Sequence, residues 1–144
     1  MVSVRWSEFL DAYEFASYGR PHESRAFINL DRGTLHCISD AIELDPELPE
    51  DLETSDRYLA LPQKNDLDLG RELAVSFIEQ RLPKELDRVI GYFHSRGAYG
   101  RFKDLVEDRG LLEAWYDFEK EATEQALRQW CAEHDIQLVF DPAA

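Results

Sequence analysis

Apolar residues near the start of the chain recur with the spacing of one helical face. Phe9, Leu10 and Tyr13 lie three, four and seven positions after Trp6, which is the period at which side chains share a face of an α-helix. Residues 19–21, Gly-Arg-Pro, interrupt this pattern and are typical of a helix end. The pattern therefore predicts a short N-terminal helix that stops before this tripeptide.

The next apolar positions favour strands. The sequence AFINLDRGTLHCIS contains two β-prone runs around Asp31-Arg32-Gly33, where Gly33 can supply the positive φ of a bulged hairpin turn. We predict a β-hairpin over residues 25–38. A third short run, residues 57–61, ends at Pro62, which cannot donate a hydrogen bond to a sheet, and predicts a further strand.

The second half of the chain has a helical period. We expect helices over residues 66–81, from Pro83 to Gly97, from Gly97 to Gly110, and over residues 111–133. Alternation over residues 136–140 predicts a last strand that could join the hairpin's sheet. The pattern predicts an α+β fold of one domain, residues 1–144, with an N-terminal helix and a small antiparallel sheet packed on a C-terminal helical layer.

The last helix has a stripe of large and small apolar residues along one face. Its members are Leu112, Trp115, Tyr116, Ala122, Ala126, Leu127 and Trp130. Glu119 falls in the middle of this stripe, and burying a carboxylate without a partner is costly. We interpret Glu119 as a buried acid that takes part in a structural ion pair or points outward at the edge of the stripe; the alternative is an acid with a raised pKa.

The length and net charge of the chain indicate which kinds of molecule it can bind. The chain has 144 residues, a length typical of one domain, and a formal net charge of −14. This charge repels nucleic acid phosphates and anionic lipid, so we expect neither direct DNA binding nor membrane binding, and it attracts basic partners. Cys37 and Cys131 form no disulfide or metal motif, and no apolar stretch is long enough to cross a membrane, which favours a cytoplasmic setting.

Negative charge concentrates between the hairpin and the third strand. Residues 40–56 contain eight carboxylates and no Lys or Arg. Loops often carry binding residues, and six members of this loop are candidates for binding a basic partner: Glu43, Asp45, Glu47, Glu50, Asp51 and Glu53. A loop that only keeps the protein soluble is an equal alternative.

Positive charge concentrates in residues 96–109, which contain the sequence GAYGRFKDL. A helix that starts near Gly97 would direct free N–H groups toward an anion, and cationic side chains surround this start: Arg96, Arg101, Lys103 and Arg109. These residues are the candidates for a phosphate or nucleotide site. In the other interpretation the cations pair internally with carboxylates, for example Arg101 with Glu119.

Sequence motifs for catalysis, cofactors and metals are missing. The chain has no phosphate-binding glycine loop, no dinucleotide fingerprint, no HExxH and no GxSxG. Its four histidines have no i, i+4 pairing, and His36 is interpreted as a surface residue of the hairpin. We therefore assign no catalytic, cofactor-binding or metal-ligating residue, and expect no cofactor.

Three segments together resemble a known family. The sequences AFINLDRGTLHCISDAIELD, RYLALPQKNDLDLG and GAYGRFKDLVEDRGLLEAWYDFEKEA are similar to those of the bacterial uncharacterised protein family 0158. The resemblance runs from about residue 26 to the last strand. It implies a small bacterial cytoplasmic protein, and it implies no activity, cofactor or catalytic residue.

Two functions remain open from the sequence. The first is a non-enzymatic module that binds a basic protein through residues 40–56. The second is a phosphate- or nucleotide-recognition protein, or a small enzyme, that uses the cationic region 96–109. The oligomeric state does not follow from the sequence.

Overall fold

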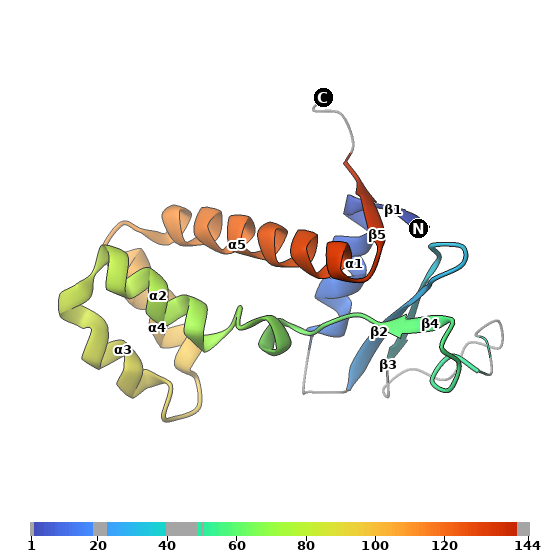
Figure 1. The fold of residues 1–144 in the computed structure, drawn as a ribbon. Coiled ribbons are helices and arrows are strands. Elements are labelled where there is room, and N and C mark those ends of the chain that lie inside the picture. Colours follow the sequence, from blue (N-terminus) through green and yellow to red (C-terminus); the bar gives the residue numbers. More distant parts are fainter. Residues whose placement is uncertain (1, 19–22, 40–48, 50, 141–144) are drawn as a thin grey trace. The chain divides into compact units, whose positions relative to one another are not determined.

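The computed structural model of the chain describes residues 2–18, 23–39, 49 and 51–140. It has the α+β fold that the sequence predicts (Figure 1). The chain divides into two compact units, one of residues 1–67 and 127–144 and the other of residues 68–126.

The first unit contains the predicted hairpin and third strand. Its first elements, in chain order, are β1 (Val2–Arg5), α1 (Trp6–Ala16), β2 (Ser24–Asn29), β3 (Leu35–Ser39) and β4 (Tyr58–Ala60). The three strands after α1 form an antiparallel sheet in the order β3-β2-β4. Phe27 lies opposite His36 of β3 on one side and Ala60 of β4 on the other. The hairpin and the strand near residues 57–61 are thus confirmed.

The last strand pairs elsewhere than the sequence suggested. β5 (Ile136–Val139) does not join the hairpin's sheet but forms a separate parallel pair with β1, in which Val2 lies opposite Ile136 and Arg5 opposite Val139. Val2 and Val4 alternate with Ser3 and Arg5, which is the apolar-polar pattern of a strand. The prediction for β5 did not include β1 as a strand, and so it offered only the hairpin as a pairing partner.

The hairpin turn explains why the chain reverses at residues 30–34. The side-chain oxygen of Asn29 accepts hydrogen bonds from the backbone N–H groups of Asp31 and Arg32, at 2.8 and 3.1 Å. Gly33 has a φ of +76°, which glycine adopts without steric cost. The turn is therefore built by one capping amide and one left-handed glycine.

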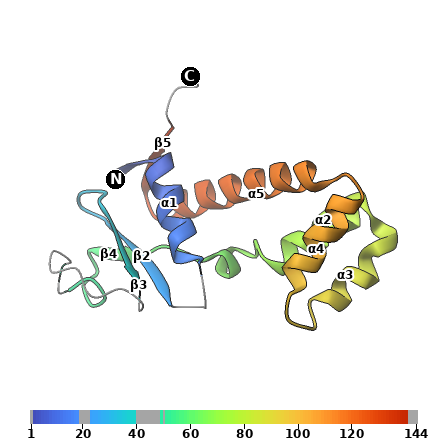
Figure 2. The same ribbon diagram turned by 180° about the vertical axis from the view of Figure 1, so that it is seen from behind.

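α1 buries one face against the hairpin. Phe9, Ala12, Tyr13 and Ala16 are buried, and the helix lies beside β2 and β3 (Figures 1 and 2). Phe9 also packs on the ring of Trp130, with ring centroids 6.0 Å apart. This packing forms the core of the first unit, in which Ile28 is fully buried.

The second unit is helical. Its elements are α2 (Arg71–Arg81), a 3₁₀ turn (Pro83–Glu85), α3 (Leu86–Tyr92), α4 (Ala98–Asp108) and the first part of α5 (Leu112–Glu133), which passes into the first unit at Leu127. The prediction of a continuous helix over 66–81 is wrong at its start. A separate 3₁₀ turn covers Lys64–Leu67, and Asp68 then takes a left-handed φ of 55°, so the α-helix begins only at Arg71.

The core of the second unit is built around Trp115. This residue has no exposed surface, and its ring packs edge-to-face against Phe102 and Phe77, with centroids 4.7 and 5.4 Å away. The stripe on α5 is narrower than predicted, because Tyr116 is 45% exposed. Trp130, also on the stripe, is partly buried.

Among the described helices, none has the length and apolar character needed to cross a membrane.

Candidate partner-binding surface

The second half of the acidic loop contains a buried side chain and a hydrogen-bonded turn. Leu52 is buried, and its backbone N–H donates to the carbonyl oxygen of Pro49. The carbonyl oxygen of Asp51 accepts from Thr54 and Ser55, at 3.1 and 2.9 Å, and forms a tight turn. One apolar side chain and one turn therefore hold this part of the loop in place.

Two ion pairs connect this region to the hairpin. The guanidinium of Arg25, on β2, pairs with Glu53, and Arg57 pairs with Asp31 of the hairpin turn at 2.9 Å. Both pairs are partly open to solvent, so each contributes little to stability. Glu53 thus pairs with a cation of its own chain. The sequence had made it a candidate for binding a basic partner protein.

The described carboxylates of the loop differ in their surroundings. Asp51 and Asp56 are exposed, while Glu53 is paired with Arg25. The other four candidate residues lie outside the described residues: Glu43, Asp45, Glu47 and Glu50. The proposal that this loop binds a partner therefore rests on its charge and on the anchored half.

Three of the four cations in residues 96–109 contact three different side chains. Arg109 pairs with Glu85 at 2.9 Å, and the ammonium of Lys103 lies 5.8 Å from the ring centre of Tyr116. Arg101 donates to the hydroxyl of Ser95 at 2.9 Å. Each of these three cations therefore has a contact within the second unit.

The backbone at the start of α4 has the features of an anion site. Gly97 precedes the helix with a φ of +78°, no side chain caps the first turn, and this turn contains no acidic residue. Arg96 and Arg101 are exposed at this end. The helix start can therefore still approach an anion through its N–H groups.

Glu119 is partly buried and faces a tyrosine of α4. Burial raises the pKa of Tyr99 to about 12, and the charges of Glu119 and Glu72 contribute to this rise. Glu119 therefore acts on the side chain of another helix, in keeping with a structural role. No group of three or more potential metal ligands occurs in the part of the chain that the structure describes.

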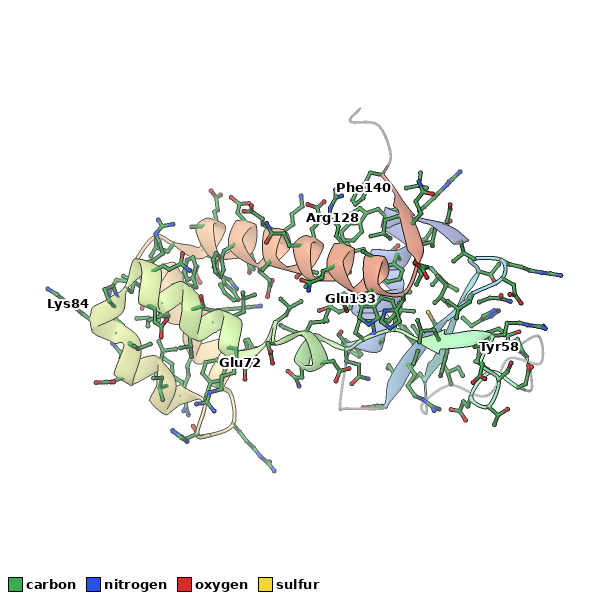
Figure 3. The ribbon with its side chains drawn as sticks, viewed as in Figure 1. Tyr58, Glu72, Lys84, Arg128, Glu133 and Phe140 are labelled. Atoms are coloured by element: carbon green, nitrogen blue, oxygen red, sulfur yellow. The ribbon has the colours of Figure 1, made fainter. Side chains whose placement is uncertain are left out.

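An aromatic cluster at the end of β5 is not predicted by the sequence pattern. Phe140 stacks on Trp6 with ring centroids 5.2 Å apart, and the guanidinium of Arg128 lies 3.9 Å from the centre of the Phe140 ring. Figure 3 shows Arg128 of α5 beside Phe140. No local sequence pattern signals this cluster, because its members come from three separate elements of the fold.

Comparisons of the chain with family models, curated proteins and solved structures find no match. The resemblance to the uncharacterised family 0158 stays a prediction.

Proposed function

We propose that the protein is a non-enzymatic interaction module that binds a basic protein partner through its acidic loop, residues 40–56. The observation that carries the proposal is the distribution of charge. The loop has eight carboxylates and no Lys or Arg of its own. Glu53 pairs with Arg25 of β2, whereas Asp51 and Asp56 are exposed to a partner.

The anchored half of the loop supports a binding role over a solubilising one. Leu52 is buried and the turn at Asp51 is hydrogen-bonded, so this end of the loop is held in a fixed conformation. A fixed end reduces the conformational entropy that a loop loses on binding. The remaining carboxylates then attract a basic partner at long range and increase its association rate.

An association-rate measurement tests this proposal. The probe is a fluorescent Arg-rich peptide, and the variant carries Glu43→Gln, Glu47→Gln and Glu50→Gln, which leaves the Glu53–Arg25 pair intact. A matched control removes the same charge from exposed helix positions, with Glu14→Gln, Glu107→Gln and Glu121→Gln. We expect the loop variant to slow association by about tenfold and the control by less than about twofold. Equal effects of the two variants, or no binding of the peptide, would contradict the proposal.

A second candidate function, anion recognition, is supported by the uncapped start of α4. Inorganic phosphate or ATP would then shift the amide resonances of Ala98, Tyr99 and Gly100, and Arg101→Gln would reduce the shifts. Shifts that are spread over all cationic regions of the chain would argue against a site at this helix start.

A further inference from the structure

One ion pair joins the acidic loop to the neighbouring sheet. Arg25 lies on β2, the central strand of the antiparallel sheet (Figure 1). Its guanidinium donates a hydrogen bond from Nη1 to Oε1 of Glu53, a residue 28 positions away in the sequence. A cation of the chain itself therefore already binds a carboxylate of the loop, residues 40–56, for which a basic partner is proposed.

Glu53 remains accessible to a partner while it is paired. The side chain of Glu53 is 52% exposed, whereas that of Arg25 is 34% exposed. An ionised carboxylate accepts hydrogen bonds at two oxygens, and within the described part of the chain the contact with Arg25 is made at one of them, Oε1. A cation that approaches from solvent can therefore reach Glu53 before Arg25 leaves it.

The turn that presents Glu53 has contacts of its own. The carbonyl oxygen of Asp51 accepts hydrogen bonds from the backbone N–H groups of Thr54 and Ser55, at 3.1 and 2.9 Å. Leu52, directly before Glu53, is buried. Loss of the ion pair would therefore release the carboxylate without removing the hydrogen bonds of the turn.

The ion pair is weak enough to be exchanged, yet it is formed most of the time. A pair of charges this open to solvent stabilises the paired state by a factor of up to about five, because water solvates both groups when they separate. An arginine of a partner thus meets a carboxylate that is occupied in most molecules. Its apparent affinity falls in proportion to the fraction of molecules in which Glu53 is available.

We propose that Arg25 is an internal competitor of the basic partner: it occupies Glu53 in the unbound protein, and an arginine of the partner takes its place on binding. The pair within the chain also shows which chemistry Glu53 accepts, a guanidinium that donates to a carboxylate. This competition rests on the proposed binding function of residues 40–56. It adds a regulatory contact, because a segment with one cation loses affinity, whereas an arginine-rich segment that meets several carboxylates overcomes the competition.

Equilibrium binding of the fluorescent Arg-rich peptide tests the competition. Arg25→Gln makes Glu53 available, so we expect the dissociation constant to fall by about three- to fivefold. Arg57→Gln is the matched control, because it also removes a cation from a solvent-open ion pair next to the loop, but its partner Asp31 belongs to the hairpin turn. We expect less than about a twofold change for this control. Equal gains for the two variants would contradict a specific role of Arg25.

A double-mutant cycle separates competition from long-range attraction. Long-range attraction alone predicts the same effect of Glu53→Gln whether or not Arg25 is present. Competition predicts that Glu53→Gln weakens binding by less than about twofold when Arg25 is present, and by about fivefold in the Arg25→Gln background, where the peptide's arginine uses the carboxylate. Equal weakening in the two backgrounds would overturn the proposal.

Two further substitutions at the same position distinguish charge from packing. Arg25→Met keeps the apolar stem of the side chain and removes its charge, so it should increase affinity as much as Arg25→Gln does. Arg25→Lys keeps a cation beside Glu53 and should leave the dissociation constant within about twofold of wild type. A gain with Arg25→Lys as large as that with Arg25→Gln would assign the effect to packing and overturn the competition.

Different outcomes would overturn the competition and the proposed function. If the peptide does not bind, or if the loop variant and its helix control slow association equally, both are wrong. If the loop variant slows association by about tenfold while Arg25→Gln leaves the dissociation constant unchanged, the loop binds a basic partner and Arg25 does not compete with it.

Discussion

The carbonyl oxygen of Ser3 lies where a side chain at Gly33 would have to begin. A β-carbon at position 33 would stand 2.4 Å from this oxygen and 3.4 Å from the carbonyl carbon. Gly33 also has a φ of +76°. Two independent constraints, close contact with the β1 backbone and a left-handed conformation, therefore favour glycine at this turn.

Gly33→Ala should lower the free energy of unfolding by about 3 kcal/mol or more. A left-handed φ costs roughly 1–2 kcal/mol for a residue with a β-carbon, and the contact with a backbone atom adds a cost that no side-chain rotation can relieve. Urea denaturation followed by circular dichroism measures the loss. Gly110→Ala is the matched control, because Gly110 has a φ of +71° but no atom lies within 4 Å of the position that a β-carbon would take there.

Asparagine at the same two positions separates the two constraints. Asparagine tolerates the left-handed conformation, so Gly110→Asn should cost less than about 1 kcal/mol. Gly33→Asn should remain nearly as destabilising as Gly33→Ala, because its β-carbon still meets the Ser3 oxygen. A Gly33→Asn protein as stable as wild type would show that the contact with β1 is not a constraint.

Trp115→Ala should cost about 3–5 kcal/mol, since the residue is fully buried between Phe77 and Phe102. Tyr116→Ala, one position along the helix, removes a largely exposed ring and should cost less than about 1 kcal/mol. Both values follow from urea denaturation monitored by far-ultraviolet circular dichroism. Similar losses for the two variants would mean that Trp115 does not form the core of the second unit.

The indole nitrogen of Trp115 is buried in this core without a hydrogen-bond partner among the described residues. A buried donor without a partner costs about 1–3 kcal/mol. Trp115→Phe removes this donor together with part of the ring. We therefore expect Trp115→Phe to lose less than about half as much stability as Trp115→Ala.

The two thiols should differ in reactivity and in their effect on stability at high pH. Burial raises the pKa of Cys131 to about 12, and partial burial also raises the pKa of Cys37. With Ellman's reagent near pH 8, we expect Cys37 to react in the native protein, since it is exposed, and Cys131 to react only after unfolding. Two rapidly reacting thiols in the native protein would contradict the burial of Cys131.

The raised pKa of Cys131 also determines the sign of a pH effect. The unfolded thiol loses its proton near pH 8.5, whereas the folded thiol keeps it up to about 12. The stability contributed by the neutral thiol is therefore complete below about pH 8.5 and is lost as the pH rises toward 12. Cys131→Ala should flatten this decline in urea midpoints, and an unchanged slope would exclude Cys131 as its source.

Local patterns were sufficient for most helices and strands of this fold. The apolar period of α1, the glycine of the hairpin turn and Pro83 before α3 each depend on residues close in sequence, so the sequence predicts them. The pairing of β5 with β1 joins the two ends of the chain and depends on which partner strand is available. The partner of β5 is determined by the tertiary structure. The local sequence pattern also allowed pairing with the hairpin, which does not occur.

For the candidate sites, too, the sequence predicted the charged regions but not the partners of their side chains. Charge counting found the acidic loop and the cationic region, because composition alone reveals them. It did not reveal that Glu53 is paired with Arg25, that Arg109 is paired with Glu85, or that Arg101 contacts Ser95. These partners lie 28, 24 and 6 positions apart in the chain, and folding selects them from many carboxylates and hydroxyls of equal chemical suitability.

The acidic loop provides the last prediction, which concerns stability. Glu43→Gln, Glu47→Gln and Glu50→Gln together should leave the thermal midpoint unchanged or slightly higher, because fewer like charges repel one another. Adding Glu53→Gln removes the partner of Arg25, whose side chain is 34% exposed against 52% for Glu53. An ion pair this open to solvent contributes at most about 1 kcal/mol, so the fourth substitution should lower the midpoint by only a few degrees.

Differential scanning calorimetry of the triple and quadruple variants measures both effects. A decrease for the triple variant would show that these carboxylates pair with cations inside the fold, and the loop would then serve stability and not a partner. A neutral triple variant that still slows association with the Arg-rich peptide would separate the two roles. Charge in residues 40–50 would then act on binding, while Glu53 links the loop to Arg25 of β2.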